Sequence, residues 1–409
     1  MRTNWAGNVT FKASGVARPT TIDELREVVA GADRVRAVGT GHSFNLIVDT
    51  TGRLVSLADL PQAIDIDPVN QTVTVPAGMR YGELVTRLDA AGFALHNLAS
   101  LPHITVAGAV ATATHGSGVN NGNLATPVCA LEMVTGSGAL VSLDGEALAG
   151  AAVSLGALGI VTKLTFRLAK TFEIMQYVYD DVPREDVNEI LSSGYSVSLF
   201  TDWRTPRRVN QVWRKCLPGE QNAWTGGTPA DGPRHPIPDM DPVTTTQQLG
   251  VPGPWHERLT HFRLDHTPSA GDELQSEYFV PLASAEDALS ALDPIAERIA
   301  AVLQISEIRT VKADNLWLSP AFERDCLAIH FTWVKDPAAV GEVIDLLEER
   351  LAPFDPRPHW GKLFHRRPAL HEGFVALMDR YDPDGKLRND FMAAIVQSGE
   401  TPAPSGMAR

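Results

Sequence analysis

Three segments in the first 170 residues are rich in glycine, alanine and hydroxylated residues. They are Gly39-Thr40-Gly41-His42-Ser43, the run from Asn97 to Gly118, and the run from Ser154 to Thr162. An ordinary core would use bulkier side chains, whereas a backbone that lies against a large flat ligand and its phosphates needs small ones. Three such segments in one part of the chain therefore predict a large cofactor that carries phosphate.

The segment from Gly39 to Ser43 follows a predicted strand, so its backbone N–H groups can turn toward an anion. Glycine permits positive φ and has no Cβ to block a phosphate. The fingerprint of nicotinamide-binding domains needs a third glycine three positions after the second, and Phe44 stands there. From this segment alone, a phosphate cradle and a plain tight turn both remain open.

The same part of the chain alternates helix and strand patterns. Apolar residues recur at helical spacing over 22–31, and Thr21 with Glu24 forms a predicted capping box in front of them. The other expected elements are strands at 34–38 and 71–75, a helix at 81–91 and a hairpin of 130–134 with 139–143. This order predicts a mixed α+β domain.

From about Thr171 the pattern changes. Residues 204–254 form a loop-rich tract with prolines at 229, 233, 236, 238, 242, 252 and 254, which is too long for an ordinary connection, so we expect it to cover or border something. Beyond it, strands are expected at 273–281, 304–311 and 326–333, and helices at 285–302 and 337–351. The pattern predicts a second domain, built on an antiparallel sheet flanked by helices.

The formal net charge of −14 over 409 residues argues against binding nucleic acid or an anionic membrane face, so we expect a small or neutral partner. The N-terminus lacks the apolar core of a signal peptide, and no stretch approaches the roughly 20 apolar residues of a membrane span. Cys129, Cys216 and Cys326 are odd in number and far apart, which favours a reducing compartment over a disulfide framework. We therefore expect a soluble cytoplasmic protein.

A bound metal is not expected. Although the chain has 12 histidines, it contains no His-Glu-x-x-His or Cys-x-x-Cys motif, and the spacing of His359 and His365 supports no site.

Two pairs of polar residues lie in predicted strands of the second domain. Glu307 and Arg309 are two residues apart, so on a strand both side chains emerge from the same face, and His330 with Thr332 has the same spacing. Neighbouring strands would thus offer four polar groups to a single cleft. The residues alone also allow a second interpretation. In it, each pair lies on a solvent-exposed face of an antiparallel sheet, and Lys362 is an exposed surface lysine.

Four segments, in order, resemble the FAD domain of flavoenzymes of the vanillyl-alcohol oxidase type: 39–43, Ser100-Leu101-Pro102-His103, 108–116 and Gly156-Ala157-Leu158-Gly159. Within that group, further segments resemble the bacterial alditol oxidases, also called xylitol oxidases: 4–8, 199–204, 253–258, 307–311, 330–334 and 357–362. This resemblance covers nearly the whole chain. It implies an FAD-binding domain at 1–172, a substrate domain at 173–375, a segment at 376–398 that returns to the FAD domain, and a flexible tail at 399–409.

The resemblance also implies that His42 is bonded covalently to the flavin through a ring nitrogen. Imidazole is a nucleophile when neutral, and histidine is the side chain most readily neutral near physiological pH. The remaining FAD contacts implied by the resemblance are Ala37, Val38, Gly39, Thr40, Gly41, Ser43, Ser100, Thr105, Gly108, Thr112, Ala113, Thr114, His115, Val161 and His359.

On the substrate side, the resemblance implies that a polyol is bound by Ser100, Glu307, Arg309, Thr332 and Lys362. The terminal primary alcohol would lose a hydride to flavin N5 while Arg309 and Lys362 stabilise developing alkoxide charge, giving an aldose. Dioxygen would then reoxidise the flavin and yield hydrogen peroxide. The proton acceptor stays open between His330 and Lys362, and the small residue Ala99 is expected to leave dioxygen a path to the flavin.

The same residues also fit two other functions. A sugar-lactone oxidoreductase on the same FAD fold would accept a cyclic substrate, and a non-catalytic protein would hold a polyol or a flavin without turnover. We expect a monomer.

Overall fold

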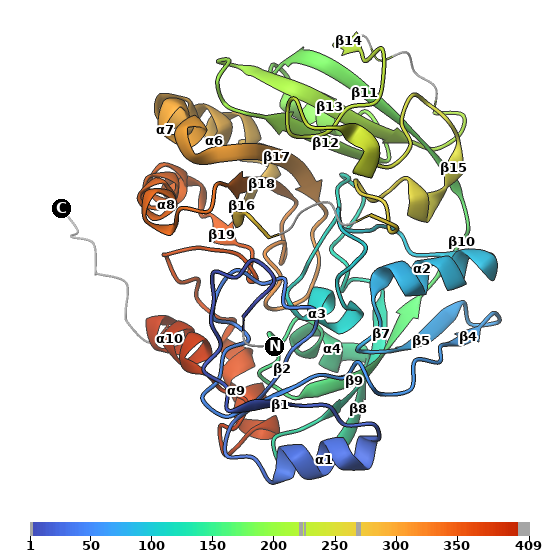
Figure 1. Ribbon diagram of the computed structural model, residues 1–409, viewed down its shortest axis with the longest axis vertical. Helices are drawn as coiled ribbons and strands as arrows, with labels where there is room; N and C mark the ends of the chain where they lie inside the picture. The colour runs from blue at the N-terminus through green and yellow to red at the C-terminus, as the bar shows by residue number, and fades with distance from the viewer. Residues whose placement is uncertain (1–2, 221–223, 225, 267–270, 400–409) are drawn as a thin grey trace.

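The computed structural model describes residues 3–220, 224, 226–266 and 271–399 (Figure 1). The first part of the chain forms a parallel sheet in the order β1 (Gly15–Ala17), β3 (Arg53–Val55), β2 (Val35–Ala37). It also forms an antiparallel sheet in the order β4 (Asp65–Asp67), β5 (Thr72–Pro76), β9 (Ile160–Arg167), β7 (Val128–Val134), β8 (Leu140–Asp144). The helices of this part are α1 (Ile22–Ala30), α2 (Tyr81–Ala90), α3 (Val106–Ala111) and α4 (Leu148–Ala151), and β6 (Phe93–Ala94) pairs with β10 (Ala169–Lys170).

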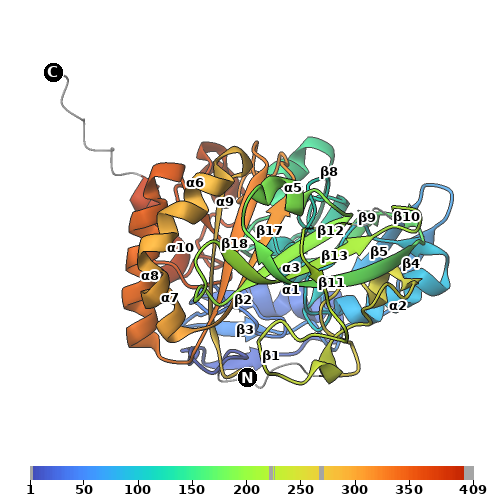
Figure 2. The same cartoon turned by 90° about the horizontal axis from the view of Figure 1, so that it is seen from above.

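The middle of the chain forms a large antiparallel sheet. Its order is β14 (Thr228–Pro229), β11 (Glu173–Pro183), β13 (Arg208–Cys216), β12 (Ser196–Thr201), β17 (Leu303–Val311), β18 (Cys326–Trp333), β16 (Leu274–Pro281), β19 (Arg357–Pro358), and β15 (Gly253–Pro254) pairs with the start of β11. The helices beside it are α5 (Val187–Leu191), α6 (Ala285–Leu292), α7 (Ala296–Val302) and α8 (Pro337–Leu351), and Figure 2 shows α6, α7 and α8 lengthwise at one side of the molecule.

The two faces of this sheet differ in chemistry because successive residues of a strand point to opposite sides. Leu199, Ile308 and Ile329 face the helices and share a core cluster with Leu289 and Val340. The alternate residues of β17, β18 and β16 point to the other face, toward the first part of the chain. The α+β class and the antiparallel sheet flanked by helices are therefore confirmed.

Most expected elements are present within one or two residues of their predicted ends. At the start of α1 the first half of the predicted capping box is formed, since Thr21 Oγ1 accepts from Glu24 N at 3.2 Å; the Glu24 carboxylate reaches back one residue further and accepts from Thr20 N at 2.7 Å. A capped start fixes where the helix begins, since it satisfies N–H groups that the helix itself leaves unpaired.

Two local expectations need correction. The tract 204–254 is not loop throughout, because Arg208–Cys216 forms β13, an inner strand of the large sheet. Pro206 and Pro218 flank a proline-free stretch here, so the tract's overall proline content concealed the strand. The expected helix at 285–302 is divided into α6 and α7 by a 3₁₀ turn at Asp293–Ile295, because Pro294 cannot donate a helical hydrogen bond.

The rest of the tract lies over part of the sheet, as expected. Gln211 Nε2 of β13 donates to the carbonyl of His235 at 3.0 Å, and Gly250 N donates to the carbonyl of Gln176 of β11 at 2.9 Å. This cover continues past residue 254 to His261 and Phe262, whose N–H groups both donate to the carbonyl of Ser100.

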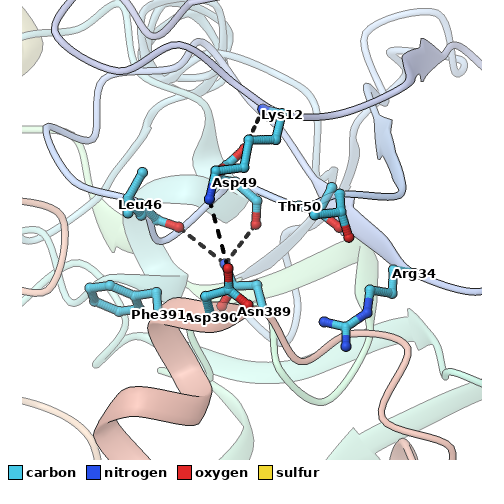
Figure 3. A pocket seen from close by; sticks show the side chains of 9 residues that line it. Lys12, Arg34, Leu46, Asp49, Thr50, Asn389, Asp390 and Phe391 are labelled. Carbon is cyan, nitrogen blue, oxygen red and sulfur yellow. Dashed lines mark hydrogen bonds and ion pairs between the residues drawn. The ribbon is translucent and has the colours of Figure 1, made fainter.

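The last described residues return to the first part of the chain. Helices α9 (Glu372–Tyr381) and α10 (Asp390–Gly399) bury Phe374, Met378 and Met392 in the same cluster as Leu131 of β7. Between these helices, Asn389 Nδ2 donates to the carbonyls of Leu46, Ile47 and Asp49, and Figure 3 shows its amide directed at this loop. Gly399 ends α10, and the rest of the predicted tail, 400–409, lies outside the described residues.

None of the helices in the described part of the chain has the length and apolar content needed to cross a membrane.

Candidate active site

A row of polar side chains crosses three neighbouring strands on the sheet face opposite the helices. His330 of β18 lies opposite Glu307 of β17 on one side and opposite Glu277 of β16 on the other. Arg309 and Thr332 each stand two residues further along their strands, so they share this face. All five residues are buried, with at most 8% of their surface exposed. The two pairs predicted from i, i+2 spacing are thus brought together on adjacent strands.

Glu277 is the common partner of the cations in this row. Its Oε1 accepts from Arg309 Nη2 at 2.7 Å and contacts His115 Nε2 at 3.1 Å, while its Oε2 accepts from Lys362 Nζ at 2.5 Å. Burial pushes the pKa of Glu277 upward, but the charges of Lys362 and Arg309 outweigh burial and hold that pKa well below its usual range. Glu277 is therefore an anion that binds both cations.

Lys362 follows β19 and reaches His330 Nδ1 at 2.8 Å. Because an ammonium can only donate, Nδ1 accepts, and the ring hydrogen lies on Nε2, which is 3.1 Å from Thr332 Oγ1. Burial lowers the pKa of His330 well below its ordinary value, and the charge of Lys362 lowers it further. The imidazole is thus neutral at pH 7 and lies between an ammonium and a hydroxyl.

Glu307 has a separate set of partners. Its Oε1 lies 2.7 Å from Nε2 of His261, whose Nδ1 lies 3.1 Å from the ammonium of Lys215. Burial raises the pKa of Glu307, but Arg309 and His261 lower it more, so the carboxylate is charged. Among the described residues, Arg309 Nε has no hydrogen-bond partner although it is buried; it lies 3.6 Å from Glu307 Oε1. A buried donor without a partner is available to a ligand.

The loop around residues 39–45 lies beside the segment that carries Lys362. Phe44 N donates to the carbonyl of Gly361 at 2.7 Å, and Asn45 Nδ2 donates to the carbonyl of Lys362 at 2.7 Å. His359 N in turn donates to the carbonyl of Glu277 at 3.0 Å. The first glycine-containing segment is thereby held next to the polar row.

The three small-residue segments also lie against one another. A Cβ on Gly39 would stand 2.2 Å from Thr105 Oγ1, and one on Gly108 would stand 2.8 Å from the same atom, so neither position accepts a side chain without movement. Leu155 N donates to the carbonyl of Ala111 at 3.1 Å. Segments far apart in the sequence therefore form one surface of exposed backbone and small side chains.

The predicted cofactor residues are distributed over this surface. Gly39 and Gly108 are exposed, while the half-buried members are Ala37, Thr40, His42, Ser43, Ser100, Thr112, Thr114 and Val161, and the buried ones are Val38, Gly41, Thr105, Ala113, His115 and His359. His115 is the member that also contacts the polar row, through Glu277.

His42 is held in a defined orientation. Its ring stacks on Trp5 with centroids 4.9 Å apart, and its Nδ1 lies 2.8 Å from Thr40 Oγ1. Burial lowers the pKa of His42 to about 4, and the charges of His103 and Arg80 add to this effect. The imidazole is therefore neutral at pH 7, the state in which it acts as a nucleophile.

Two stretches of the chain match known families. Residues 13–144 match the FAD binding domain family, and residues 272–395 match the D-arabinono-1,4-lactone oxidase family. Over 410 aligned residues the chain is 50% identical to an alditol oxidase from a Streptomyces species, covering 96% of this chain and 98% of the relative. The chain belongs to the alditol oxidase family.

Other relatives of this alditol oxidase family member are more distant. An L-gulono-1,4-lactone dehydrogenase from Mycobacterium tuberculosis is 28% identical over 96% of this chain and 98% of the relative. A cholesterol oxidase from B. sterolicum has the same fold, with a TM-score of 0.73 over 96% of both chains but only 14% identity.

The site fits the FAD expected of the alditol oxidase family. Exposed Gly39 and Gly108 flank the hydroxyl of Thr105, so backbone N–H groups and hydroxyls are presented where no side chain blocks a phosphate. Thr112 and Thr114 add two further hydroxyls, whose Oγ1 atoms are 3.1 Å apart. The neutral His42 lies three residues after Gly39, in the loop around residues 39–45.

Three residues of this alditol oxidase site were missed by the sequence reasoning. Glu277 lies in the strand predicted at 273–281, where Gln275 and Glu277 show the same i, i+2 spacing that identified Glu307 and Arg309. His261 and Lys215 lie in or beside the proline-rich tract, and no pattern in the sequence connects them to the site. Glu277 could have been found from spacing, whereas the other two required the tertiary structure.

Proposed function

We propose that this protein oxidises the terminal primary hydroxyl of an alditol to the aldose, using FAD and dioxygen and releasing hydrogen peroxide. The observation that carries this proposal is the buried polar row beside the small-residue surface. Its two cations, Arg309 and Lys362, are balanced by two anions, Glu277 and Glu307, so the site offers charged hydrogen-bonding groups without a net charge. Such a site suits an uncharged substrate with many hydroxyls.

FAD would be held by the backbone and hydroxyls of the three small-residue segments, and we infer a covalent bond to His42. The neutral imidazole of His42 supports this inference, since only the neutral ring has a free lone pair. When bound, FAD supplies the hydride acceptor for alcohol oxidation and returns the electrons to dioxygen.

The alcohol oxygen would be polarised by Lys362 and Arg309, which have donors not used by Glu277. Lys362 has three N–H groups and donates two of them, to Glu277 and to His330. Its third N–H and the unpartnered Arg309 Nε can stabilise negative charge on that oxygen. Ser100, Thr332 and Glu307 would bind the other hydroxyls.

The hydroxyl proton would be accepted by the pair formed by Lys362 and His330. Nδ1 of His330 carries the free lone pair of the ring and accepts from Lys362, while Nε2 carries the ring hydrogen. The hydroxyl proton would therefore reach Nδ1 either directly or through Lys362, which would pass one of its own protons to Nδ1 as it accepts that of the alcohol. His330 is the first acceptor on the direct route, and Lys362 is the first acceptor on the relayed one.

A substrate panel tests the proposed activity. Purified protein in air is expected to produce peroxide with xylitol or sorbitol and little with an aldonolactone. Activity on the lactone without activity on any alditol would instead support a lactone oxidoreductase, the activity named for the relatives of lower identity. A flavin absorbance that no alditol bleaches under anaerobic conditions would favour a non-catalytic binding protein.

Acid precipitation tests the covalent bond. The pellet of wild-type protein is expected to stay yellow and to fluoresce as flavin, and His42→Ala is expected to lose this colour to the supernatant. A colourless pellet from active wild-type protein would refute the linkage.

Ala99 is proposed to leave dioxygen a path to the flavin. It is small and 8% exposed, directly before Ser100. Ala99→Leu is expected to slow reoxidation of reduced flavin in stopped flow without slowing anaerobic reduction by alditol. An unchanged reoxidation rate would refute the proposed role of Ala99 in dioxygen access.

We further propose the division into an FAD domain at 1–172, a substrate domain at 173–375 and a returning segment at 376–398, acting as a cytoplasmic monomer. The packing of α9 and α10 against β7 supports the returning segment. The three cysteines are free, and Cys216 and Cys326 are buried, which supports a reducing compartment.

A further inference from the structure

Lys215 of β13 is a buried cation outside the polar row. Only 1% of its surface is exposed, yet its ammonium has three acceptors: the carbonyl of Leu259 at 2.5 Å, the carbonyl of Thr260 at 3.3 Å and His261 Nδ1 at 3.1 Å. Three acceptors match the three N–H donors of a protonated lysine. A buried lysine whose three hydrogen bonds are complete is held in one place while it is protonated.

The contact with Lys215 determines which nitrogen of His261 carries hydrogen. Because the ammonium can only donate, Nδ1 of His261 accepts, and the ring hydrogen must lie on Nε2. That hydrogen points at Oε1 of Glu307, 2.7 Å away, and a carboxylate can only accept. Both hydrogen bonds therefore have a fixed direction: Lys215 donates to His261, and His261 donates to Glu307.

His261 is also fixed from two other directions. Its backbone N–H donates to the carbonyl of Ser100 at 3.2 Å, and its ring packs edge-on against Phe200 and Trp213, with centroids 5.5 and 5.3 Å away. One residue thus links the loop of Ser100 with the carboxylate of Glu307, two of the groups expected to bind the substrate.

We propose that Lys215 and His261 are positioning residues for Glu307: the buried ammonium fixes the tautomer of His261, whose Nε2–H holds Oε1 of Glu307 and leaves Oε2 to accept a hydrogen bond from the alditol. This inference rests on the proposed function. It adds two residues, from a strand and a loop outside the polar row, to the machinery that orients the substrate.

The geometry has a consequence for pH dependence. Burial lowers the pKa of Lys215 to about 7, with Glu307 raising it and Arg309 lowering it. The titratable and charged groups that face Lys215 are His261, which follows the proline-rich tract, and Glu307 and Arg309 of β17. Burial lowers the pKa of His261 to about 4, so His261 stays neutral at the pH at which Lys215 loses its proton. When Lys215 loses its proton, two N–H donors remain for its three acceptors, so the hydrogen bond to Nδ1 competes with those to the carbonyls of Leu259 and Thr260 and the ring of His261 is held less firmly.

Kinetics on two variants of His261 test the positioning role. His261→Leu is expected to lower kcat/KM for xylitol by about 10- to 100-fold, the loss of one hydrogen bond to a charged group. His261→Gln is expected to keep most of the wild-type value, because the amide oxygen and nitrogen reproduce the acceptor and the donor of the ring. If His261→Gln is as impaired as His261→Leu, the ring does more than position Glu307 and the proposal is wrong.

Lys215→Met supplies the pH test. The ratio of wild-type to Lys215→Met kcat/KM is expected to be large below pH 7 and to fall above it, as the wild-type lysine loses its proton. Lys312→Met, which removes a half-exposed lysine paired with Asp325, is the matched control and should leave the profile unchanged. A ratio that is constant from pH 6 to 9 would contradict the proposal.

Thermal unfolding provides a readout that needs no turnover. The pKa of Lys215 in the folded protein lies below that of a lysine in the unfolded chain. Above pH 7 the folded protein therefore binds fewer protons than the unfolded chain does. The stability of the wild type relative to Lys215→Met is thus expected to rise with pH. Glu307→Gln removes a charge that raises this pKa, so in that background the rise should begin at lower pH. An unmoved onset would refute the link from Lys215 to Glu307, whereas failure of wild-type protein to oxidise any alditol would refute the proposed function alone.

Discussion

At the scale of single residues, Glu277 has the largest number of charged partners in the site. Its carboxylate accepts from both Arg309 and Lys362, and it is completely buried. Two cations side by side in a buried site would repel each other, so an anion between them is needed to hold both near the substrate. The role we assign to Glu277 is to place the donors of Arg309 and Lys362, without contact with the alditol itself.

Glu277→Gln is expected to lower kcat/KM for alditols by about 100-fold, because both cations lose the anion that positions them. Burial lowers the pKa of Lys362 and the charge of Glu277 opposes this effect, so without that charge the pKa falls further and the pH profile of the variant should shift to lower pH. The measurement is steady-state peroxide production between pH 6 and 9.

Glu348→Gln is the matched control for that experiment. Glu348 is also buried, but it accepts from Tyr278 and from backbone N–H groups on the helix-covered side of the sheet. Its loss should reduce stability and leave the pH profile in place. Equal effects of the two substitutions would show that Glu277 is structural only.

At the scale of elements, helix α8 shows how local sequence determines a helix start. Asp336 accepts from the N–H groups of Ala338 and Ala339 at 3.2 and 3.1 Å, and Pro337 occupies the first helical position, where no donor is lost. The helix then buries Val340, Ile344 and Leu347 against the large sheet. Because α8 covers the back of the strands that carry Glu277 and His330, its stability supports the site from behind.

Asp336→Ala is expected to destabilise the protein by about 1 kcal/mol, the usual value of an N-cap side chain. Denaturant unfolding followed by circular dichroism measures this change. Glu349→Ala, an exposed change within the same helix, should change the free energy of unfolding by much less. Equal values for both would mean that the cap contributes nothing.

At the scale of the whole molecule, Arg36 joins the two ends of the chain. Its buried guanidinium donates to the carbonyls of Ile47, Leu155, Gly156 and Leu387, at 2.5 to 2.9 Å. These carbonyls belong to the loop after β2, the third small-residue segment and the connection between α9 and α10. One side chain therefore ties the returning segment to the surface expected to bind FAD.

Arg36→Met should destabilise the folded protein by about 3 kcal/mol or more, because four buried carbonyls lose their donor at once. We expect retention of FAD to fall together with stability, which flavin absorbance after gel filtration would reveal. Arg34→Met removes an exposed arginine two residues away, with one 3.4 Å contact to the carbonyl of Arg388, and should have little effect on either quantity. A variant as stable as wild type would show that water replaces the guanidinium.

Much of the fold follows from the sequence because its signals are local. Capping residues, the alternation of strands and the small-residue segments each depend on neighbours within about ten residues, which is why α1, β17 and β18 were placed correctly. The errors arose where two local signals competed. Pro206 and Pro218 concealed β13, and Pro294 interrupts an otherwise continuous helical pattern.

The sequence by itself determined that Glu307 shares a face with Arg309, that His330 shares one with Thr332, and that the first part of the chain presents backbone to a large ligand. Only the tertiary structure decided which strands are neighbours, and with them the partners of each buried charge. Glu277 is 85 residues before Lys362, and Lys215 is 92 before Glu307, so no periodic pattern relates them. Burial is the physical reason that they meet, since a charge removed from water must find an opposite charge or hydrogen-bond partners wherever the fold supplies them.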